Sequence, residues 1–247
     1  MTFLILFVAS LWAGTQNALA GGGSFITLPS LMLTGMDARA ANITSAVALF
    51  PAQLATGWTG RKHVEGAAGL SFPALVIISL VGGAVGAVLL LVTPPTFFAR
   101  LVPWLVLFAT AVFAWGSFVP RRRPEPRMGR LSAAGAQLCI SIYGGYFGGG
   151  IGFLMLAAFT ACGVVLRVAG ATKNVLAAAM NASAVAIFLF SPEVRWIAAA
   201  VSSAGAIIGG IAGGLMLHKV NEKALRVAIV VIGLLLTVGL FQRASPQ

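Results

Sequence analysis

Two glycine triplets carry the chemistry that this sequence offers, because each interrupts an apolar segment. Gly21-Gly22-Gly23 precede Ser24 in the first half of the chain, and Gly148-Gly149-Gly150 lie near the start of the second half. Inside a bilayer, non-helical backbone persists only where protein or a water-filled cavity satisfies its freed N–H and C=O groups. N–H groups at such breaks, aided by the helix dipole, form anion nests. The triplets therefore predict an anion site at two broken helices.

Polar side chains follow each triplet and complete the predicted site. Hydroxyl and amide groups could replace water around an anion's oxygens, and one lysine would add a formal positive charge. Each group also has a structural explanation, since lysine can snorkel to an interface, threonine can bond an i−4 carbonyl and amides can join helices. These alternatives stay open for the members of the set, which are Ser24, Asn42, Thr44, Gln53, Thr172, Lys173, Asn174 and Asn181.

The composition places the chain in a membrane. Of its 247 residues, 59% are hydrophobic and 9% are charged, and apolar runs of about 18 or more residues recur, as a hydrocarbon core of about 30 Å demands. A net charge of +11 could suggest nucleic acid. Arg and Lys lie mainly between the apolar runs, however, which indicates positive-inside anchoring. We therefore expect an all-α polytopic membrane protein with lipid around it and no nucleic-acid partner.

The apolar segments fall into two similar sets. Residues 1–120 form a predicted first transmembrane repeat, 121–130 a basic cytoplasmic linker with five arginines and two prolines, and 131–247 a second repeat. Segments 25–35 and 151–165 are too short to cross alone at about 1.5 Å per residue, which makes them half-helices. The first segment imitates a signal peptide but lacks a charged n-region, so we expect a retained helix. The other predicted helices cover 2–19, 40–58, 67–92, 96–119, 131–147, 170–190, 194–217 and 224–241.

A nearly constant shift relates the two sets and predicts a gene duplication. Gly21 pairs with Gly148 at 127 residues and Thr44 with Thr172 at 128. Two glycine pairs four residues apart, a spacing that lets helices approach closely, also correspond: Gly82 and Gly86 with Gly209 and Gly213. Opposite charge bias at equivalent loops favours inverted repeats, each with a glycine-broken first helix. Two parallel repeats of four crossings stay open.

Enzyme chemistry finds no support in the sequence. It has no HExxH motif, no paired intramembrane carboxylates, no histidine cluster and no nucleophile motif. Cys139 and Cys162 lack CxxC or Cys/His spacing, so we interpret them as buried hydrophobes. We expect no catalytic residue, metal or cofactor. A non-transport accessory subunit is an alternative that would not need two broken sites, and a homodimer stays open as the association state.

Two pairs of motifs resemble the sulfite exporter TauE/SafE family. Asn17–Pro29 followed by Ala41–Gln53 forms the first pair, and Tyr143–Gly152 followed by Ala171–Leu176 forms the second. The resemblance covers nearly the whole chain and implies a multi-pass transporter of the bacterial inner membrane for sulfite, organosulfonates or related sulfur anions. The chain departs from the family at Ser45-Ala46, where many members have a polar or basic pair.

Together these observations predict a secondary transporter that exports sulfite or an organosulfonate by alternating access at a midplane site. An inside-negative potential already drives an anion outward, by about 2.3 kcal/mol per charge per 100 mV, so export needs no coupling carboxylate. The alternative is an uptake permease for a sulfur-containing or other small organic anion, which would need a coupling ion. The predicted substrate-binding residues are Gly21, Gly22, Gly23, Ser24, Asn42, Thr44, Gln53, Gly148, Gly149, Gly150, Thr172, Lys173, Asn174 and Asn181.

Overall fold

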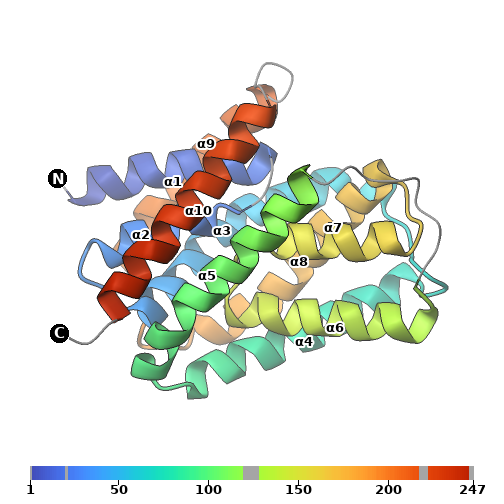
Figure 1. Ribbon diagram of the computed structural model, residues 1–247, viewed down its shortest axis with the longest axis horizontal. Helices are drawn as coiled ribbons and strands as arrows, with labels where there is room; N and C mark the ends of the chain where they lie inside the picture. The colour runs from blue at the N-terminus through green and yellow to red at the C-terminus, as the bar shows by residue number, and fades with distance from the viewer. Residues whose placement is uncertain (1, 20–21, 119–127, 217–221, 245–247) are drawn as a thin grey trace.

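The computed structural model describes residues 2–19, 22–118, 128–216 and 222–244, and the fold within these ranges is all-helical, as expected (Figure 1). The predicted linker at 121–130 lies largely outside them. The first half contains α1 (Thr2–Leu19), α2 (Ser24–Met32), α3 (Ala38–Gly60), the 3-10 turn η1 (Arg61–His63), α4 (Phe72–Val92) and α5 (Pro95–Phe118). The second half contains α6 (Arg130–Tyr146), α7 (Ile151–Ala161), α8 (Leu166–Phe188), α9 (Trp196–Met216) and α10 (Glu222–Ala244).

Several helices are suited to hydrocarbon. Residues 72–92, 95–115 and 168–188 are each long and apolar enough to cross a membrane, and 151–161, 196–212 and 230–242 are shorter apolar stretches. The outward side chains of α4 include Ile77 and Val81, which are 61% and 52% exposed. Such a continuous apolar surface is costly in water and compatible with lipid. These features are those of a multi-pass helical membrane protein.

Glycines let α4 lie directly on α6. A Cβ at Gly82 would approach Leu138 O to 3.1 Å, and a Cβ at Gly86 would overlap the carbonyl of Ile142. The predicted helix contact of this pair is thus confirmed. Because the contacted positions advance together along both chains, α4 and α6 run in the same direction.

Helices α1 and α9 pair in the same way. A Cβ at Gly205 would meet Phe7 O at 2.5 Å, and one at Gly209 would overlap the carbonyl of Leu11. These two helices also run in the same direction. The contact predicted for Gly209 is confirmed. The contacts of Gly213 are not among those that the structure describes.

One end of the molecule, here the Arg39 end, joins the start of α3, the end of α4 and the α8–α9 loop. Arg39 forms an ion pair with Glu193, in which Nε donates to Oε2 at 3.0 Å. Its Nη1 donates to the carbonyls of Leu91, at 3.2 Å, and Thr93. A single guanidinium therefore ties three segments that are distant in sequence.

The opposite end, here the Lys62 end, joins the segment between α3 and α4 to the start of α8. The N–H of Glu65 donates to Thr172 Oγ1 at 3.2 Å. Since α6 is parallel to α4, it starts at this end. Since α1 is parallel to α9, it starts at the Arg39 end. The two halves of the chain therefore begin at opposite ends.

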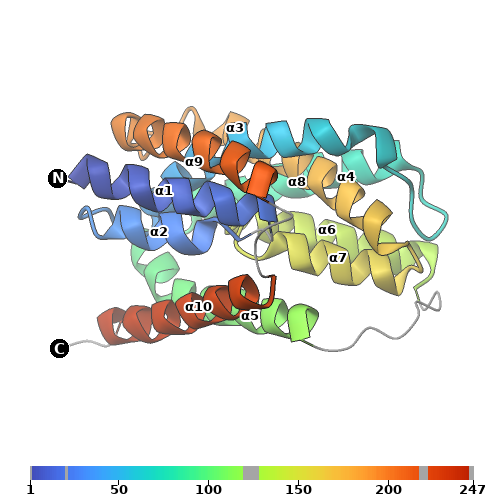
Figure 2. The ribbon, with the colours of Figure 1, turned by 90° about the horizontal axis from the view of Figure 1, so that it is seen from above.

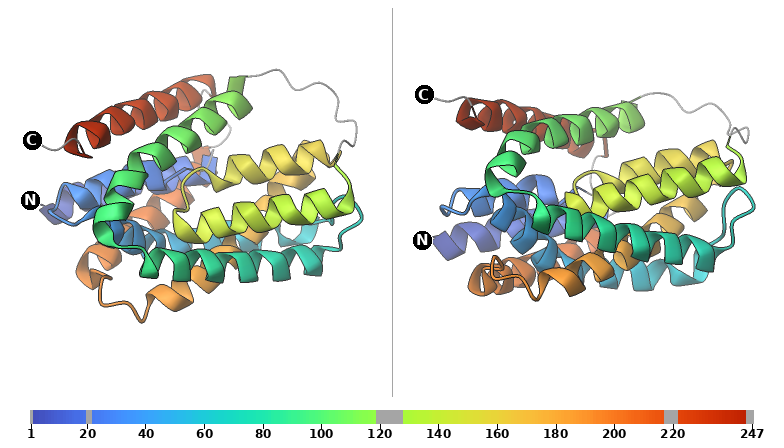
Figure 3. Two further views of the ribbon diagram at one scale, coloured as in Figure 1. Left: turned by 60° about the horizontal axis from the view of Figure 1, so that its bottom comes forward. Right: turned by 90° about the horizontal axis from the view of Figure 1, so that it is seen from below.

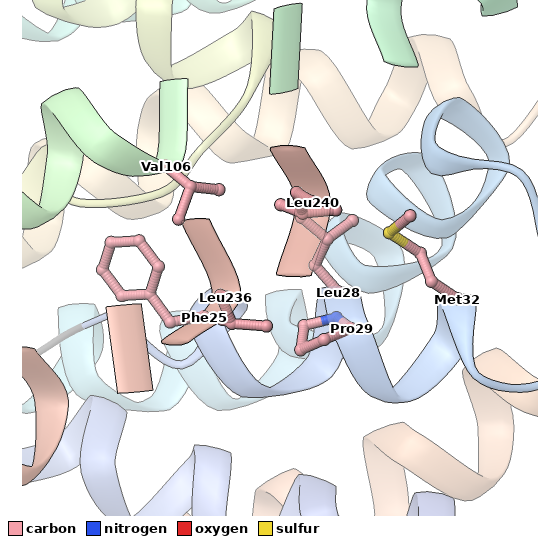
Figure 4. Close-up of a pocket in the computed structure, with 7 residues that line it drawn as sticks. All are labelled: Phe25, Leu28, Pro29, Met32, Val106, Leu236 and Leu240. Atoms are coloured by element: carbon pink, nitrogen blue, oxygen red, sulfur yellow. The ribbon is translucent and has the colours of Figure 1, made fainter. Parts of the chain in front are cut away.

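Helices α5 and α10 form a layer of their own (Figure 2), which packs on α2, α3 and α7 and contacts α6 through ring pairs such as Phe108 with Tyr143. The pairs α1–α2 and α6–α7 each fold back as a hairpin, and Figure 3 shows the second of them. An apolar crevice of about 210 Å³, part of it open to the exterior, lies where α10 and α5 meet α2 (Figure 4). Its lining residues are Phe25, Leu28, Pro29, Met32, Val106, Leu236 and Leu240.

Three expected helix boundaries are wrong, at two places in the chain. Residues 67–71 were expected in the helix over 67–92, but Ala67 and Leu70 exchange backbone hydrogen bonds around a tight turn with positive φ at Ala68 and Gly69. The helix starts only after Ser71, whose hydroxyl accepts from Ala74 N, because turn and cap residues override an apolar run.

The second correction concerns α7, which ends at Ala161 and not at residue 165. The next residues turn through Gly163, whose φ is 81°, while Val164 N bonds back to Phe159 O at 3.0 Å. This arrangement is the usual left-handed glycine termination of a helix. It leaves α8 free to begin at Leu166, earlier than the expected residue 170.

The close α4–α6 contact predicts that Gly86→Ala destabilises the protein, because the added Cβ overlaps the Ile142 carbonyl. Overpacking of this kind costs about 1–3 kcal/mol. Gly135→Ala on α6 is the matched control, since nothing lies within 4 Å of its Cβ position. Thermal unfolding in detergent should show a lower midpoint for Gly86→Ala alone. Equal midpoints for the two variants would contradict this packing.

Candidate anion-binding site

Each glycine triplet lies between the end of one helix and the start of the next. Gly22 has φ 82°, and Gly148 and Gly150 have φ 78° and 77°. Glycine adopts this left-handed backbone without the steric cost that a Cβ brings. Gly21 lies outside the described residues. The chain can therefore reverse direction at both triplets within a few residues.

Side chains satisfy backbone carbonyls at both reversals. Gln16 Nε2 donates to Gly22 O at 3.1 Å, and Thr27 Oγ1 approaches Gly23 O at 3.4 Å. At the second reversal, Asn42 Nδ2 donates to Tyr146 O at 3.1 Å. Asn42 belongs to α3, so the first half of the chain supports the reversal in the second half.

A polar cavity lies between the two reversals and the helices α3 and α8. It measures about 500 Å³, part of which is open to the exterior. Seven predicted site residues meet around it, although they come from four separate stretches of the chain: Gly22, Ser24, Gln53, Gly148, Gly150, Lys173 and Asn174. The remaining residues of its described lining are Asn17, Thr56, Ile151, Gly152 and Ala177.

Lys173 gives the cavity its positive charge. It is the only charged residue in the described lining, and its Nζ donates to Asn174 Oδ1 at 3.0 Å. A Cβ placed on Gly152 would lie 3.4 Å from Nζ, so the ammonium lies close to the first turn of α7. The leading N–H groups of a helix lack intrahelical partners and carry partial positive charge. The ammonium and the helix start thus favour an anion in the same space.

Gln53 adds an amide on the α3 side of the cavity. Its Oε1 is buried and has no hydrogen-bond partner among the described residues. A buried amide oxygen without a partner is costly, and only a ligand that donates a hydrogen bond would relieve this cost. Rotation of the amide by half a turn would instead present its two N–H donors to an anion.

Three other predicted residues bond to protein and do not line the cavity. Thr44 Oγ1 accepts from Arg195 N at 3.2 Å at the Arg39 end, while Thr172 Oγ1 accepts from Glu65 N at the Lys62 end. Asn42 supports Tyr146 O as described above. All three side chains position segments around the site and are not placed to touch a ligand in the cavity.

The last three predicted residues are not part of the described lining, although Gly23 and Gly149 are each next in sequence to residues that are. Gly23 precedes α2 and accepts from Ile26 N at 3.0 Å. A Cβ on Gly149 would lie 2.6 Å from the Phe147 ring. Asn181 is buried, and its Nδ2 lacks a described partner.

Sequence reasoning missed three polar or small residues of the lining. Thr56 lies three residues after Gln53, a helical spacing that puts both on one face of α3. Asn17 precedes the first triplet by four residues, the same relation to Gly21 that Gly144 has to Gly148. Gly152 lies directly after the second reversal. The helical spacing of Thr56 was a usable signal, whereas the other two needed the folded chain.

The described residues contain no group of three or more side chains that could hold a metal ion. The described lining of the polar cavity offers an ammonium, amides, hydroxyls and backbone N–H groups. This set can bind and orient a small anion by charge-assisted hydrogen bonds.

Comparisons with known proteins agree with a transporter. A family model described as "Sulfite exporter TauE/SafE" matches residues 6–240. A "Probable membrane transporter protein" of Haemophilus influenzae is 30% identical over 239 residues, which cover 94% of this chain and 92% of the relative. The "Probable membrane transporter protein YfcA" of Escherichia coli K12 is 28% identical over 250 residues, covering 98% and 91%. The "Probable membrane transporter protein ORF9" of a Sinorhizobium species is 27% identical over 242 residues, covering 95% and 90%.

Proposed function

Since this chain belongs to the sulfite exporter TauE/SafE family, we propose that it exports sulfite or an organosulfonate across the bacterial inner membrane. The observation that carries this proposal is the polar cavity at the two glycine reversals, where Lys173 and Asn174 meet Gln53. A sulfonate group has three oxygens that accept hydrogen bonds and one negative charge to balance the ammonium. The cavity provides partners for both needs.

The proposal includes two inverted repeats, α1–α5 and α6–α10. The contact of α1 with α9 corresponds to that of α6 with α4, and the contact of α3 with α9 corresponds to that of α8 with α4. Thr44 and Thr172, which occupy equivalent positions, each accept an N–H from the loop before the packed helix. Correspondence of helix contacts and of single hydrogen bonds supports a common plan for the two halves.

Loop charges orient the chain. Arg61, Lys62 and Arg130 belong to segments at the Lys62 end, and the sequence between α5 and α6 adds further arginines. At the Arg39 end, Glu193 neutralises Arg39. By the positive-inside rule, the Lys62 end faces the cytoplasm.

The two halves of the proposed pathway differ in how tightly they are packed. Gln53 and Thr56 lie toward the cytoplasmic end of α3, and Lys173 lies toward the cytoplasmic end of α8, so the cavity occupies the cytoplasmic half. The sequence shift relates Gln53, Thr56 and Lys173 to Asn181, Ala184 and Ser45, which are buried in the other half.

Alternating access follows from this difference. In the present conformation an anion reaches Lys173 from the cytoplasm, while the Arg39–Glu193 pair and the buried equivalents close the opposite half. Exchange of the two packing arrangements would open the site outward. The inside-negative potential would then drive the anion out, by about 2.3 kcal/mol per charge per 100 mV.

Flux in liposomes tests the proposed function. We expect purified protein to move sulfite or a sulfonate saturably and Lys173→Gln to lose at least about tenfold in flux, because an unpaired anion in a low-dielectric cavity is strongly disfavoured. Lys62→Gln is the matched control, since Lys62 is an exposed lysine outside the cavity. If the folded wild-type protein moves none of these anions, the proposed substrate is wrong. If Lys173→Gln and Lys62→Gln give equal flux, the assignment of Lys173 to the anion site is wrong.

Thiol labelling tests the orientation and the closed half. In a variant whose Cys139 and Cys162 are replaced by alanine, Thr56→Cys should react with a membrane-impermeant reagent from the cytoplasmic side. Ala184→Cys, at the equivalent position, should stay protected because Ala184 is 1% exposed. Adding Glu193→Gln should raise its labelling from the periplasmic side. Labelling of Ala184→Cys as fast as Thr56→Cys without that change would contradict the inward-facing assignment.

A further inference from the structure

We infer that the cavity selects anions by charge number and accepts a monovalent anion in preference to a divalent one. The inference rests on the proposed function, because it concerns the ligand of the same cavity. It assigns hydrogensulfite and singly charged sulfonates as ligands, and it disfavours sulfate and the sulfite dianion.

The charge inventory of the cavity carries this inference. Lys173 is the one charged residue of the described lining, and Asn17, Ser24, Gln53 and Thr56 are neutral. The Lys173 ammonium has no carboxylate partner there, since its described contact is the amide oxygen of Asn174. A monovalent anion therefore brings the formal charge of the site to zero.

Among the described residues, the first half of the chain contributes no second cation to the lining. Ser45 and Ala46 occupy the positions that Lys173 and Asn174 hold in the second half. Ser45 is 2% exposed, and its hydroxyl pairs with that of Thr27. The two halves thus share a plan but contribute unequally to the charge of the site.

A divalent anion would leave one negative charge uncompensated. Removing charge from water is costly in a low-dielectric interior unless a partner balances it. The neutral amides, hydroxyls and helix N–H groups stabilise the first charge along with the ammonium, but they provide no second full charge. Protonation of the sulfite dianion removes this excess charge, so the protonated form is the one that fits.

Competition for sulfite flux in liposomes, with equal pH on both sides, tests the inference. Methanesulfonate carries one charge and sulfate two at every pH used. For the wild type we expect methanesulfonate to compete at least about tenfold better than sulfate, a difference of about 1.4 kcal/mol. Sulfite itself should lose apparent affinity relative to methanesulfonate as pH rises through its second ionisation, because any loss of the Lys173 charge affects both anions.

A second cation in the cavity should change this preference. Thr56→Lys places an ammonium in the lining and should raise the competition by sulfate relative to methanesulfonate about tenfold or more. Thr59→Lys is the matched control, because Thr59 lies one turn further on α3, is exposed and is outside the described lining. If Thr56→Lys does not fold, the wild-type competition and pH profile still decide.

The possible outcomes distinguish a failure of the charge selection from a failure of the proposed transport function. Sulfate that competes as well as methanesulfonate against a working wild-type transporter overturns the charge selection and leaves the proposed function intact. Absence of any sulfite or sulfonate flux overturns the proposed function, and the charge selection with it. A preference for methanesulfonate that Thr56→Lys reverses and Thr59→Lys leaves unchanged supports both.

Discussion

Backbone groups freed at the two glycine reversals must find hydrogen-bond partners where lipid offers none, and the rest of the architecture depends on this. Gln16 supports the first reversal from within its own hairpin, whereas Asn42 of α3 reaches across to Tyr146 O at the second. Each reversal therefore requires packed helices around it. The same packing places the first turn of α7, Gln53 and Lys173 around one polar space.

The described lining of that space contains one charged residue, Lys173, and the proposed mechanism depends on this. Arg39 is compensated by Glu193 and by backbone carbonyls at one end. Lys173 has a neutral amide partner and is left available for a ligand. In the proposed mechanism, Arg39 belongs to an ion pair that can open, and Lys173 provides the positive charge that a bound anion compensates.

Much of the fold could be predicted from the sequence, because the lengths of the apolar runs and the glycines that interrupt them determine where most helices begin and end. Most helix ends lie within two or three residues of expectation, and the errors fall at the 67–71 turn and at Gly163, where local turn chemistry outweighs hydropathy. Seven of the predicted site residues line the cavity, and all of them belong to the glycine triplets or to the polar positions that follow the triplets in the sequence. Periodicity could not distinguish Thr44 and Thr172, which hold loops, from Gln53, which lines the cavity; that difference depends on which helix lies opposite each side chain.

Locating a bound anion in a crystal structure tests directly whether the polar cavity is the anion site. Selenite has the shape and charge of sulfite, and its selenium can be located by anomalous diffraction from crystals of the full chain. We expect a peak inside the cavity within hydrogen-bond distance of Lys173 Nζ, and its loss in Lys173→Gln. A peak at another place in a protein that transports selenite would contradict the assignment of this cavity as the anion site.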